Sequence, residues 1–354
     1  MKDRISSAQI FVPCKNFNRS LEFFVDNLGF RVEMIFPADA PSTAMISGYG
    51  LNLRLETSNE NQPLTIQLVG DFSAETSREI YSPDGVRVIL IDEKSNIKIP
   101  EAVNEFVLTT LENENAWVKG RAGMLYRDLI PSRLGGRFVA SHISIPEGGE
   151  VPDYVHFHKV RFQMIYCISG WAKLVYEDQG EPFLMNAGDC VLQPPEIRHR
   201  VLETSANFEV LEIGCPAIHE TFADHVLDLP NEIIAPERIF GEQVFLHHTA
   251  DNAVWEISEI KNLESRNTGI VKAADGLADV RAFRAIGDSH FSIKHSDEFL
   301  FFFVLKGSLR LSGGEDATYF VEKDGSFVLP AEREYFIDAD KSLEMLRVSL
   351  PAER

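Results

Sequence analysis

The sequence has few cysteines, no long apolar run and no excess of positive charge, and each shortage excludes a class of protein. The four cysteines among 354 residues are far apart and form no Cys-x-x-Cys pair, so we expect buried free thiols. No window approaches the roughly 18 apolar residues that span a bilayer. The first residues carry no apolar signal-peptide region. A cytoplasmic protein without membrane contact is therefore expected.

The charge balance argues against nucleic acid as a partner. Acidic residues number 54 and basic residues 34, which gives a formal net charge of −20 that would repel a phosphate backbone. The hydrophobic content of 44% and charged content of 25% are ordinary for a globular protein. The length allows two or three domains, each with a packed core.

The N-terminal region combines one helix with several strands. Residues 18–28 place Leu21, Phe24, Val25 and Leu28 on one face at helical spacing, and Gly29 follows as a stop signal. Short strand-like segments come before and after it, in the order strand, helix, strand, strand, strand. Two more strands are expected around residues 64–70 and 86–92, and the acidic stretch 93–115 is interpreted as a linker.

From residue 137 onward the chain shows only strand signals, about one every 8–12 residues, as in a β-barrel or sandwich. A boundary is expected between residues 215 and 237, where two prolines interrupt the alternation. Beyond it the earlier pattern recurs: SGWAKL (169–174) is echoed by KGSLRL (306–311), and AGDCVLQPPEIRH (187–199) by KDGSFVLPAEREY (323–335). The repetition indicates an internal duplication of one β-domain.

The first repeat carries a histidine pattern with metal-ligand chemistry. His156 and His158 are two residues apart, so on a strand they face the same side. Gln163 opens the next strand, and a turn at Pro194 brings His199 to the start of another. Three imidazoles and an amide oxygen suit a divalent first-row metal.

The spacing of these residues resembles the two motifs of the cupin superfamily over about residues 137–215. The resemblance rests on Gly149, His156, His158, Gln163, Gly170, Gly188, Pro194 and His199. It implies a mainly β chain with two jelly-roll cupin barrels, at residues 101–225 and 226–354. It also implies that His156, His158, Gln163 and His199 are the ligands of one metal ion. Gln163 stands where the family usually has Glu, and Glu196 where it usually has Gly.

Iron(II) is the first choice for the metal, with manganese, nickel, cobalt and zinc as alternatives, because imidazole-rich ligation does not select among them. A neutral Gln163 would leave the ion more positive than a Glu would. Four nearby side chains are candidates for substrate binding, namely Arg161, Arg198, Tyr166 and Tyr176. An arginine at the mouth of the barrel would suit a substrate with a carboxylate. No residue is assigned a catalytic role.

The second repeat lacks the histidine pair, and Tyr335 stands at the position of His199, so the second barrel is expected to be degenerate. The N-terminal region, residues 1–100, resembles the vicinal oxygen chelate (glyoxalase/bleomycin-resistance) family, with a βαβββ α+β fold. The resemblance rests on two segments, AQIFVPCKNFNRSLEFFVDNLGFRVE and SPDGVRVIL. Gln9 and Glu56 fall near that family's metal-binding positions, but Ile89 stands where the family usually has a Glu ligand. Two ligands are too few for a tight metal site, so a structural role is expected for this domain.

These observations together predict a metal-dependent cupin enzyme. An iron-dependent dioxygenase or related oxidoreductase acting on a small chelating substrate, such as a keto or hydroxy acid, a diketone or a phenol, is expected first. A metal-dependent isomerase or lyase, and a non-catalytic small-molecule-binding or sensor bicupin, are the alternatives. The expected partners are the small-molecule substrate and a second copy of the chain in a homodimer.

Overall fold

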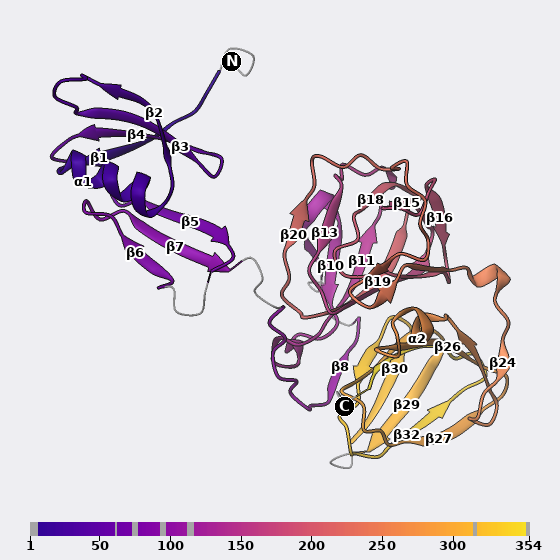
Figure 1. Cartoon of the computed structure of the whole chain (residues 1–354). Coiled ribbons are helices and arrows are strands. Elements are labelled where there is room, and N and C mark those ends of the chain that lie inside the picture. Colours follow the sequence, from indigo (N-terminus) through magenta and orange to yellow (C-terminus); the bar gives the residue numbers. More distant parts are fainter. Residues whose placement is uncertain are drawn as a thin grey trace. The chain divides into compact units, whose positions relative to one another are not determined.

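The chain divides into two compact units, Met1–Asn96 and Ile97–Arg354 (Figure 1). The computed structural model describes residues 6–60, 62–72, 77–92, 97–111, 117–313 and 317–351. Both regions expected to form barrels, 101–225 and 226–354, lie within the second unit. The division falls close to the boundary expected at residue 100.

The N-terminal unit has the predicted order of strand, helix and three strands, followed by a second small sheet. The first sheet has the order β1-β4-β3-β2 with β1 parallel to β4, and the second has the order β5-β7-β6 with β5 parallel to β7. The elements are β1 (Ile10–Cys14), α1 (Phe17–Glu22), a π-helical turn η2 (Phe23–Asn27), β2 (Arg31–Phe36), β3 (Thr43–Gly48), β4 (Leu51–Thr57), β5 (Thr65–Gly70), β6 (Glu79–Tyr81) and β7 (Arg87–Asp92).

The helix of this unit packs its apolar face against both sheets. Phe24 and Leu28 are buried as the helical spacing predicts, and Phe23 is buried as well because the wider π-helical turn brings it to the same side. The chain leaves the helix at Gly29, whose φ of +74° is the left-handed conformation that glycine adopts without strain.

The first barrel consists of a seven-stranded sheet, β23-β17-β14-β19-β11-β10-β9, facing a sheet of order β16-β15-β18-β13-β20. Its elements are β9 (Trp117–Lys119), η3 (Arg121–Gly123), β10 (Leu125–Asp128), η4 (Arg133–Gly136), β11 (Val139–Ile145), β12 (Gly149–Glu150), β13 (His156–His158), β14 (Phe162–Ser169), β15 (Trp171–Tyr176), β16 (Phe183–Asn186), β17 (Cys190–Leu192), β18 (His199–Thr204), β19 (Phe208–Cys215), β20 (Thr221–Ala223) and β23 (Leu246–His248). The short hairpin β21 (Ile239–Phe240) and β22 (Gln243–Val244) and the turn η5 (Ala250–Asn252) continue the chain toward the second barrel.

The second barrel repeats this topology, which confirms the predicted duplication. Its sheets have the orders β24-β25-β26-β33-β28-β31-β8 and β27-β32-β29-β30. The elements are β24 (Glu256–Ile257), β25 (Leu263–Asn267), α2 (Ile270–Ala273), β26 (Asp279–Ala285), β27 (Ser289–Ile293), β28 (Phe299–Lys306), β29 (Ser308–Gly313), β30 (Ala317–Glu322), β31 (Ser326–Val328), β32 (Tyr335–Ala339) and β33 (Glu344–Leu350). Every described barrel strand pair is antiparallel, as expected for a jelly roll.

The two barrels exchange edge strands, which corrects the interpretation of residues 93–115 as a linker. Strand β8 (Val107–Thr109) precedes the first barrel in sequence but pairs with β31 of the second barrel. Strand β23 lies near the start of the second repeat but pairs with β17 of the first. Residues 93–96 and 112–116 of the predicted linker lie outside the described residues. Each exchanged strand satisfies an open sheet edge, so the exchange also ties the barrels together.

A shared core lies between the barrels and explains the uninterrupted apolar run of β28. Phe299, Phe301 and Phe303 belong to a cluster that includes residues of the first barrel, and the Phe138 and Phe299 rings stack at 4.2 Å. The alternate residues Leu300 and Phe302 lie in the second barrel's own core. Both faces of the strand are thus buried, which removes the polar alternation of a half-exposed strand. The four cysteines are buried and free, as predicted.

Equivalent turns in the two barrels contain a glycine with the same backbone conformation, and replacing this glycine should destabilise the protein. Gly170 and Gly307 occupy equivalent turns, both with φ of +72°, and a Cβ on either would collide with Ser205 Oγ or Ser342 Oγ. The replacement Gly170→Ala adds this clash to left-handed backbone strain, and we expect it to lower the free energy of unfolding by about 2 kcal/mol. Urea denaturation measures the change.

The control for this prediction is Gly149→Ala, because Gly149 also has a positive φ but its added Cβ meets no atom within 4 Å. The difference between the two variants isolates the steric clash from the backbone strain. Equal destabilisation by both variants would contradict a role for the Ser205 contact.

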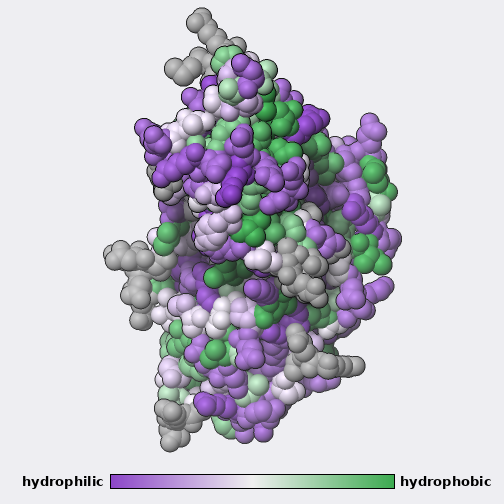
Figure 2. Space-filling view, turned by 60° about the vertical axis from the view of Figure 1, so that its left-hand side comes forward, coloured by the Kyte–Doolittle hydropathy of each residue, from purple (hydrophilic) through white to green (hydrophobic). Residues whose placement is uncertain are grey.

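Surface residues are mainly hydrophilic on the face shown in Figure 2, and hydrophobic residues form smaller groups among them. This agrees with the charge content of the sequence. Among the described residues, the helices are all too short or too polar to cross a membrane.

Candidate metal centre

Three histidines of the first barrel converge on one point. His156 and His158 share one face of β13, and His199 opens β18, where it pairs directly with His156 across the antiparallel ladder. One ring nitrogen from each of the three histidines lies within 4.8 Å of the other two, and all three side chains are buried. The structure therefore brings together the imidazoles that the strand spacing and the distant turn predicted.

Backbone carbonyls fix the orientation of all three rings. The Nδ1 atoms lie 2.8 Å from the Tyr154 carbonyl for His156, 3.1 Å from the Glu220 carbonyl for His158 and 3.0 Å from the Ile197 carbonyl for His199. A carbonyl oxygen only accepts, so each Nδ1 must carry the proton and donate it. Each Nε2 then keeps a lone pair, which is the arrangement that positions histidines on a metal.

The environment keeps these imidazoles neutral. Burial lowers the pKa of His158 to about 3, helped by the neighbouring His156 and His219 rings. Burial, followed by the nearby histidines, holds the pKa of His199 well below its ordinary value, and burial also lowers the pKa of His156. A neutral imidazole is the form that binds a metal ion.

Two buried amides extend the cluster. Gln163, on β14, accepts a hydrogen bond from Gln193 Nε2 at 2.8 Å, and the same nitrogen lies 3.1 Å from His199 Nε2. Gln193 Oε1 in turn accepts the Tyr176 hydroxyl proton at 2.9 Å. Gln193 was not predicted, although its place six residues before His199 in the turn-containing segment was a usable signal.

A carboxylate lies on the other side of Gln163. Gln163 Nε2 donates to Glu212 Oε1 at 2.5 Å, so the amide is held with its oxygen toward Gln193 and the histidines. Glu212 belongs to β19, beside Gln163 in the same sheet. Sequence analysis missed it, although an acidic residue within the apolar strand FEVLEIGC was a signal of a lined cavity.

An arginine from outside the histidine motifs also enters the site. Arg121, in the turn η3, places Nη2 3.1 Å from His156 Nε2 and pairs through Nη1 with Asp153. The Asp153 side chain is fully buried, and its other oxygen accepts the Val201 backbone N–H. The motif spacing gave no signal for Arg121, because only the folding of the chain ahead of β10 brings it over β13.

These residues fit a divalent transition-metal ion. The three Nε2 lone pairs and the Gln163 amide oxygen form a nitrogen-rich donor set of the kind that iron, manganese, nickel, cobalt and zinc accept. The ring orientations and low pKa values arise from the fold itself, and an ion would displace only the contacts that Gln193 and Arg121 make with the Nε2 atoms of His199 and His156. His156, His158, Gln163 and His199 would hold the ion.

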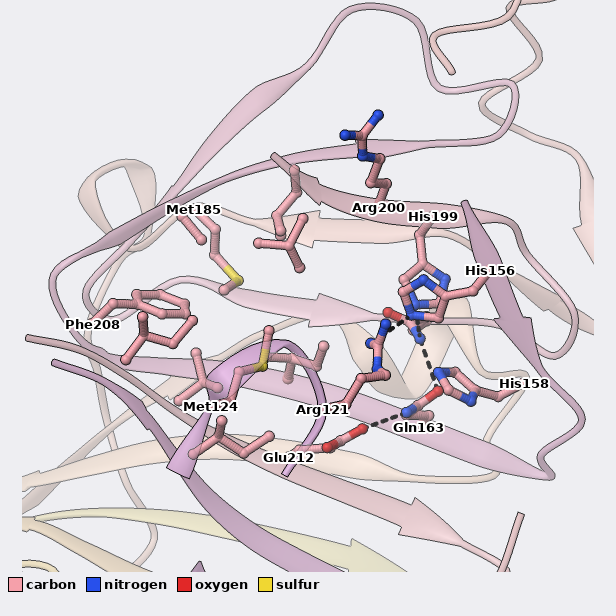
Figure 3. A pocket seen from close by; sticks show the side chains of 18 of the residues that line it. Arg121, Met124, His156, His158, Gln163, Met185, His199, Arg200, Phe208 and Glu212 are labelled. Carbon is pink, nitrogen blue, oxygen red and sulfur yellow. Dashed lines mark hydrogen bonds between the residues drawn. The ribbon is translucent and has the colours of Figure 1, made fainter. Parts of the chain in front are cut away.

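The cluster forms the polar end of a cavity of about 90 Å³ inside the barrel. Figure 3 shows the histidines, Gln163, Arg121 and Glu212 together, with Met124, Met185 and Phe208 on the opposite side. Most of the remaining lining residues are apolar, namely Ile143, Ile145, Ile165, Ala172, Leu174, Val201 and Val210, and Tyr126, Tyr176, Gln193 and Arg200 complete the wall. A ligand in this cavity would have its polar group near the histidines and its apolar part in the barrel.

Only one of the four residues expected to contact substrate lines this cavity, namely Tyr176. Arg161 lies just before β14, so the alternation of side chains along that strand does not place it on the same face as Gln163. Its guanidinium binds Glu298 of the second barrel. Arg198 pairs with Asp224 and stacks on the Phe157 ring. Tyr166 lies on the face of β14 opposite to Gln163 and accepts a hydrogen bond from Arg266. We therefore assign none of these three to the cavity.

In the described part of the chain, no other group of three or more His, Cys, Asp or Glu side chains is placed to hold a metal ion, in agreement with a degenerate second barrel and a structural N-terminal domain. Tyr335 does open β32, as the repeat predicts, but it is buried against Phe106. His295 Nε2 contacts the Leu329 carbonyl, and His290 pairs with Asp338 on the surface. In the N-terminal unit, Gln9 contacts Met45 and Glu56 pairs with Arg54, while Ile89 lies within β7.

Comparison with protein families supports the identification of the first barrel. The cupin domain family matches residues 141–214, a segment that holds all four proposed ligands. No curated protein sequence matches the chain.

Solved structures similar to this chain include oxalate decarboxylases and a salicylate dioxygenase. Oxalate decarboxylase from Lactobacillus farciminis, in a formate complex, has 14% identity and a TM-score of 0.51, covering 70% of this chain and 86% of its own. A mutant of Bacillus subtilis oxalate decarboxylase has 12% identity and a TM-score of 0.52, and the match covers 70% of this chain and 78% of the decarboxylase. Salicylate 1,2-dioxygenase from Pseudaminobacter salicylatoxidans has 14% identity and a TM-score of 0.47, covering 60% and 71%. The likeness to the two oxalate decarboxylases shows the fold alone, a mainly β chain with two β-barrels.

Proposed function

We propose that this protein is a metal-dependent cupin enzyme, with iron(II) as the first choice of metal and oxidation of a small chelating substrate by dioxygen as its reaction. The observation that supports this most strongly is the convergence of three buried imidazoles, with lowered pKa values, at the polar end of a cavity inside the barrel. When bound there, a divalent ion would supply Lewis acidity and, if it is iron, redox chemistry.

The chain's own residues would prepare this reaction. The backbone carbonyls hold His156, His158 and His199 in the binding tautomer, and Glu212 holds the Gln163 amide. The apolar wall excludes water, which strengthens electrostatic interactions at the polar end. Glu212 is also the carboxylate nearest to this end among the lining residues, so it is placed to accept a proton from a bound hydroxyl group.

A second candidate is a protein that binds a small molecule without catalysis. The contact of Arg121 Nη2 with His156 Nε2 favours it, because a guanidinium in this position uses a lone pair that a metal would need. An isomerase or lyase would use the same residues as the oxygenase but would not consume oxygen.

Two measurements separate these functions. Elemental analysis of protein purified without added metal should show about one equivalent of a transition metal, with iron expected. Oxygen consumption should then be followed with keto acids, hydroxy acids, diketones and phenols. Metal without oxygen consumption, but with substrate turnover, would indicate the isomerase or lyase; neither metal nor turnover would indicate the binding protein.

A further inference from the structure

We propose that Arg121 binds the carboxylate of the substrate, and that the substrate is a small monocarboxylic acid with an apolar body. The inference rests on the proposed function in one respect, since it takes the occupant of the cavity to be the substrate. It concerns a residue outside the cupin-matched segment of the chain.

The first argument is the position of the guanidinium. Arg121 lines the cavity at its polar end, with Nη2 directed toward the histidine cluster and Nη1 toward Asp153 (Figure 3). Its two hydrogen bonds with these partners use only part of a fork with five N–H donors. A carboxylate is the group that this planar fork binds best.

The second argument is that metal binding removes an acceptor from Arg121. His156 Nε2 has one lone pair, and an ion bound to the three histidines would take it. Nη2 of Arg121, whose side chain is one third exposed, would then face a like charge beside the buried His156 and would have lost its acceptor there. A substrate carboxylate beside the ion would replace the lost acceptor and separate the two positive charges.

Asp153 keeps Arg121 at the site during this exchange. Its carboxylate is fully buried and is held by the Val201 backbone N–H, so the ion pair fixes one edge of the guanidinium. The other edge can change its partner by a small rotation. Arg198, in contrast, is engaged by Asp224 and Phe157 away from the cavity.

The third argument is charge balance. A divalent ion and Arg121 bring three positive charges to the polar end, and Asp153 and Glu212 bring two negative charges. Arg200 also lines the cavity, but its guanidinium points away from the histidines (Figure 3). One further negative charge would therefore make the polar end neutral. Buried sites favour such pairing. A dicarboxylate would bring an excess charge and would have to place it either near Glu212 or among the methionines and Phe208 at the apolar end.

The size of the cavity limits the acid. At roughly 10–15 Å³ for each water-sized centre, a volume of about 90 Å³ holds about six to nine such units. Hexanoate and benzoate are of this size, and hexanoate matches the aliphatic and methionine-rich wall.

Calorimetric titration of the Fe(II)-loaded protein under nitrogen tests the proposal with three probes: hexanoate, the uncharged hexanamide and the dicarboxylate adipate. We expect hexanoate to bind at least about 10-fold more tightly than either of the other two. In Arg121→Gln, hexanoate should bind roughly 10- to 100-fold more weakly and lose its advantage over hexanamide, while the metal content stays unchanged. Arg121→Lys should fall between, because it keeps the charge but not the fork.

The matched control is Arg198→Gln, which removes a cation outside the cavity and should change the hexanoate affinity less than about threefold. Equal binding of hexanoate and hexanamide to the wild type, or an equal loss in the two arginine variants, would overturn the proposal. If the protein holds no metal yet still prefers hexanoate through Arg121, the proposed enzymatic function fails while this inference stands.

Discussion

Replacing His199 with alanine is expected to lower the metal affinity by more than about 100-fold and to leave the purified protein with almost no transition metal. His199 would supply one of four ligands, and its removal leaves a hole that Gln193 and Tyr176 line with groups hydrogen-bonded to each other. Even loss of a group that only supports a metal ligand typically costs 10- to 100-fold in affinity, so loss of a ligand should cost more. His156→Ala should have the same effect.

Metal analysis of the purified variants, with titration of the metal-free protein by Fe(II) and Mn(II), measures this effect. The control is His219→Ala, because the His219 ring lies 5.3 Å from that of His158 yet does not belong to the convergent cluster. This variant should keep its metal. If His156→Ala and His199→Ala both keep a full equivalent, the proposed ligand set is wrong.

The metal-free protein should lose about 3 kcal/mol of stability between pH 7.5 and pH 5.5. In the folded state the pKa of His158 is about 3 and the pKa of His199 lies well below its ordinary value, while in the unfolded chain both titrate near 6.5. Below pH 6.5 the unfolded state therefore binds protons that the folded state does not, and stability falls as the pH falls. His158 contributes roughly 1.4 kcal/mol over this range, and His199 and His156, whose pKa values are also lowered, add to it.

Urea denaturation of chelator-treated protein across this pH range tests the prediction. His158→Gln should reduce the pH dependence by roughly a third to a half, since one of the titrating groups is removed. A stability that is flat from pH 7.5 to 5.5, or that rises toward acid, would contradict neutral, buried imidazoles in the folded protein.

The sequence was sufficient for the features that depend on short spacing. Two histidines separated by one residue face the same side of any strand, and a turn at Pro194 predicts the return of His199. Three candidate ligands could therefore be placed together without coordinates. The repeat of the glycine turn likewise predicted two similar β-domains, and Gly170 and Gly307 do adopt the same φ.

Parity along a strand, in contrast, says which residues share a face but not what lies opposite that face. The arginines and Tyr166 chosen as substrate contacts are near the ligands in sequence, yet Arg161 and Tyr166 contact the second barrel. The same holds outside the first barrel. Gln9, Glu56 and Tyr335 each contact side chains that are not metal ligands.

What the sequence alone determined is therefore the barrel class, the duplication and the histidine cluster, because all three follow from the two-residue period of a strand and from its turns. Tertiary structure decided the rest. The exchange of β8 and β23, the burial of Asp153, and the meeting of Arg121 with Glu212 at one end of the cavity join segments that are far apart in the chain. Their contacts depend on how two sheets close around a core, and no local pattern encodes that closure.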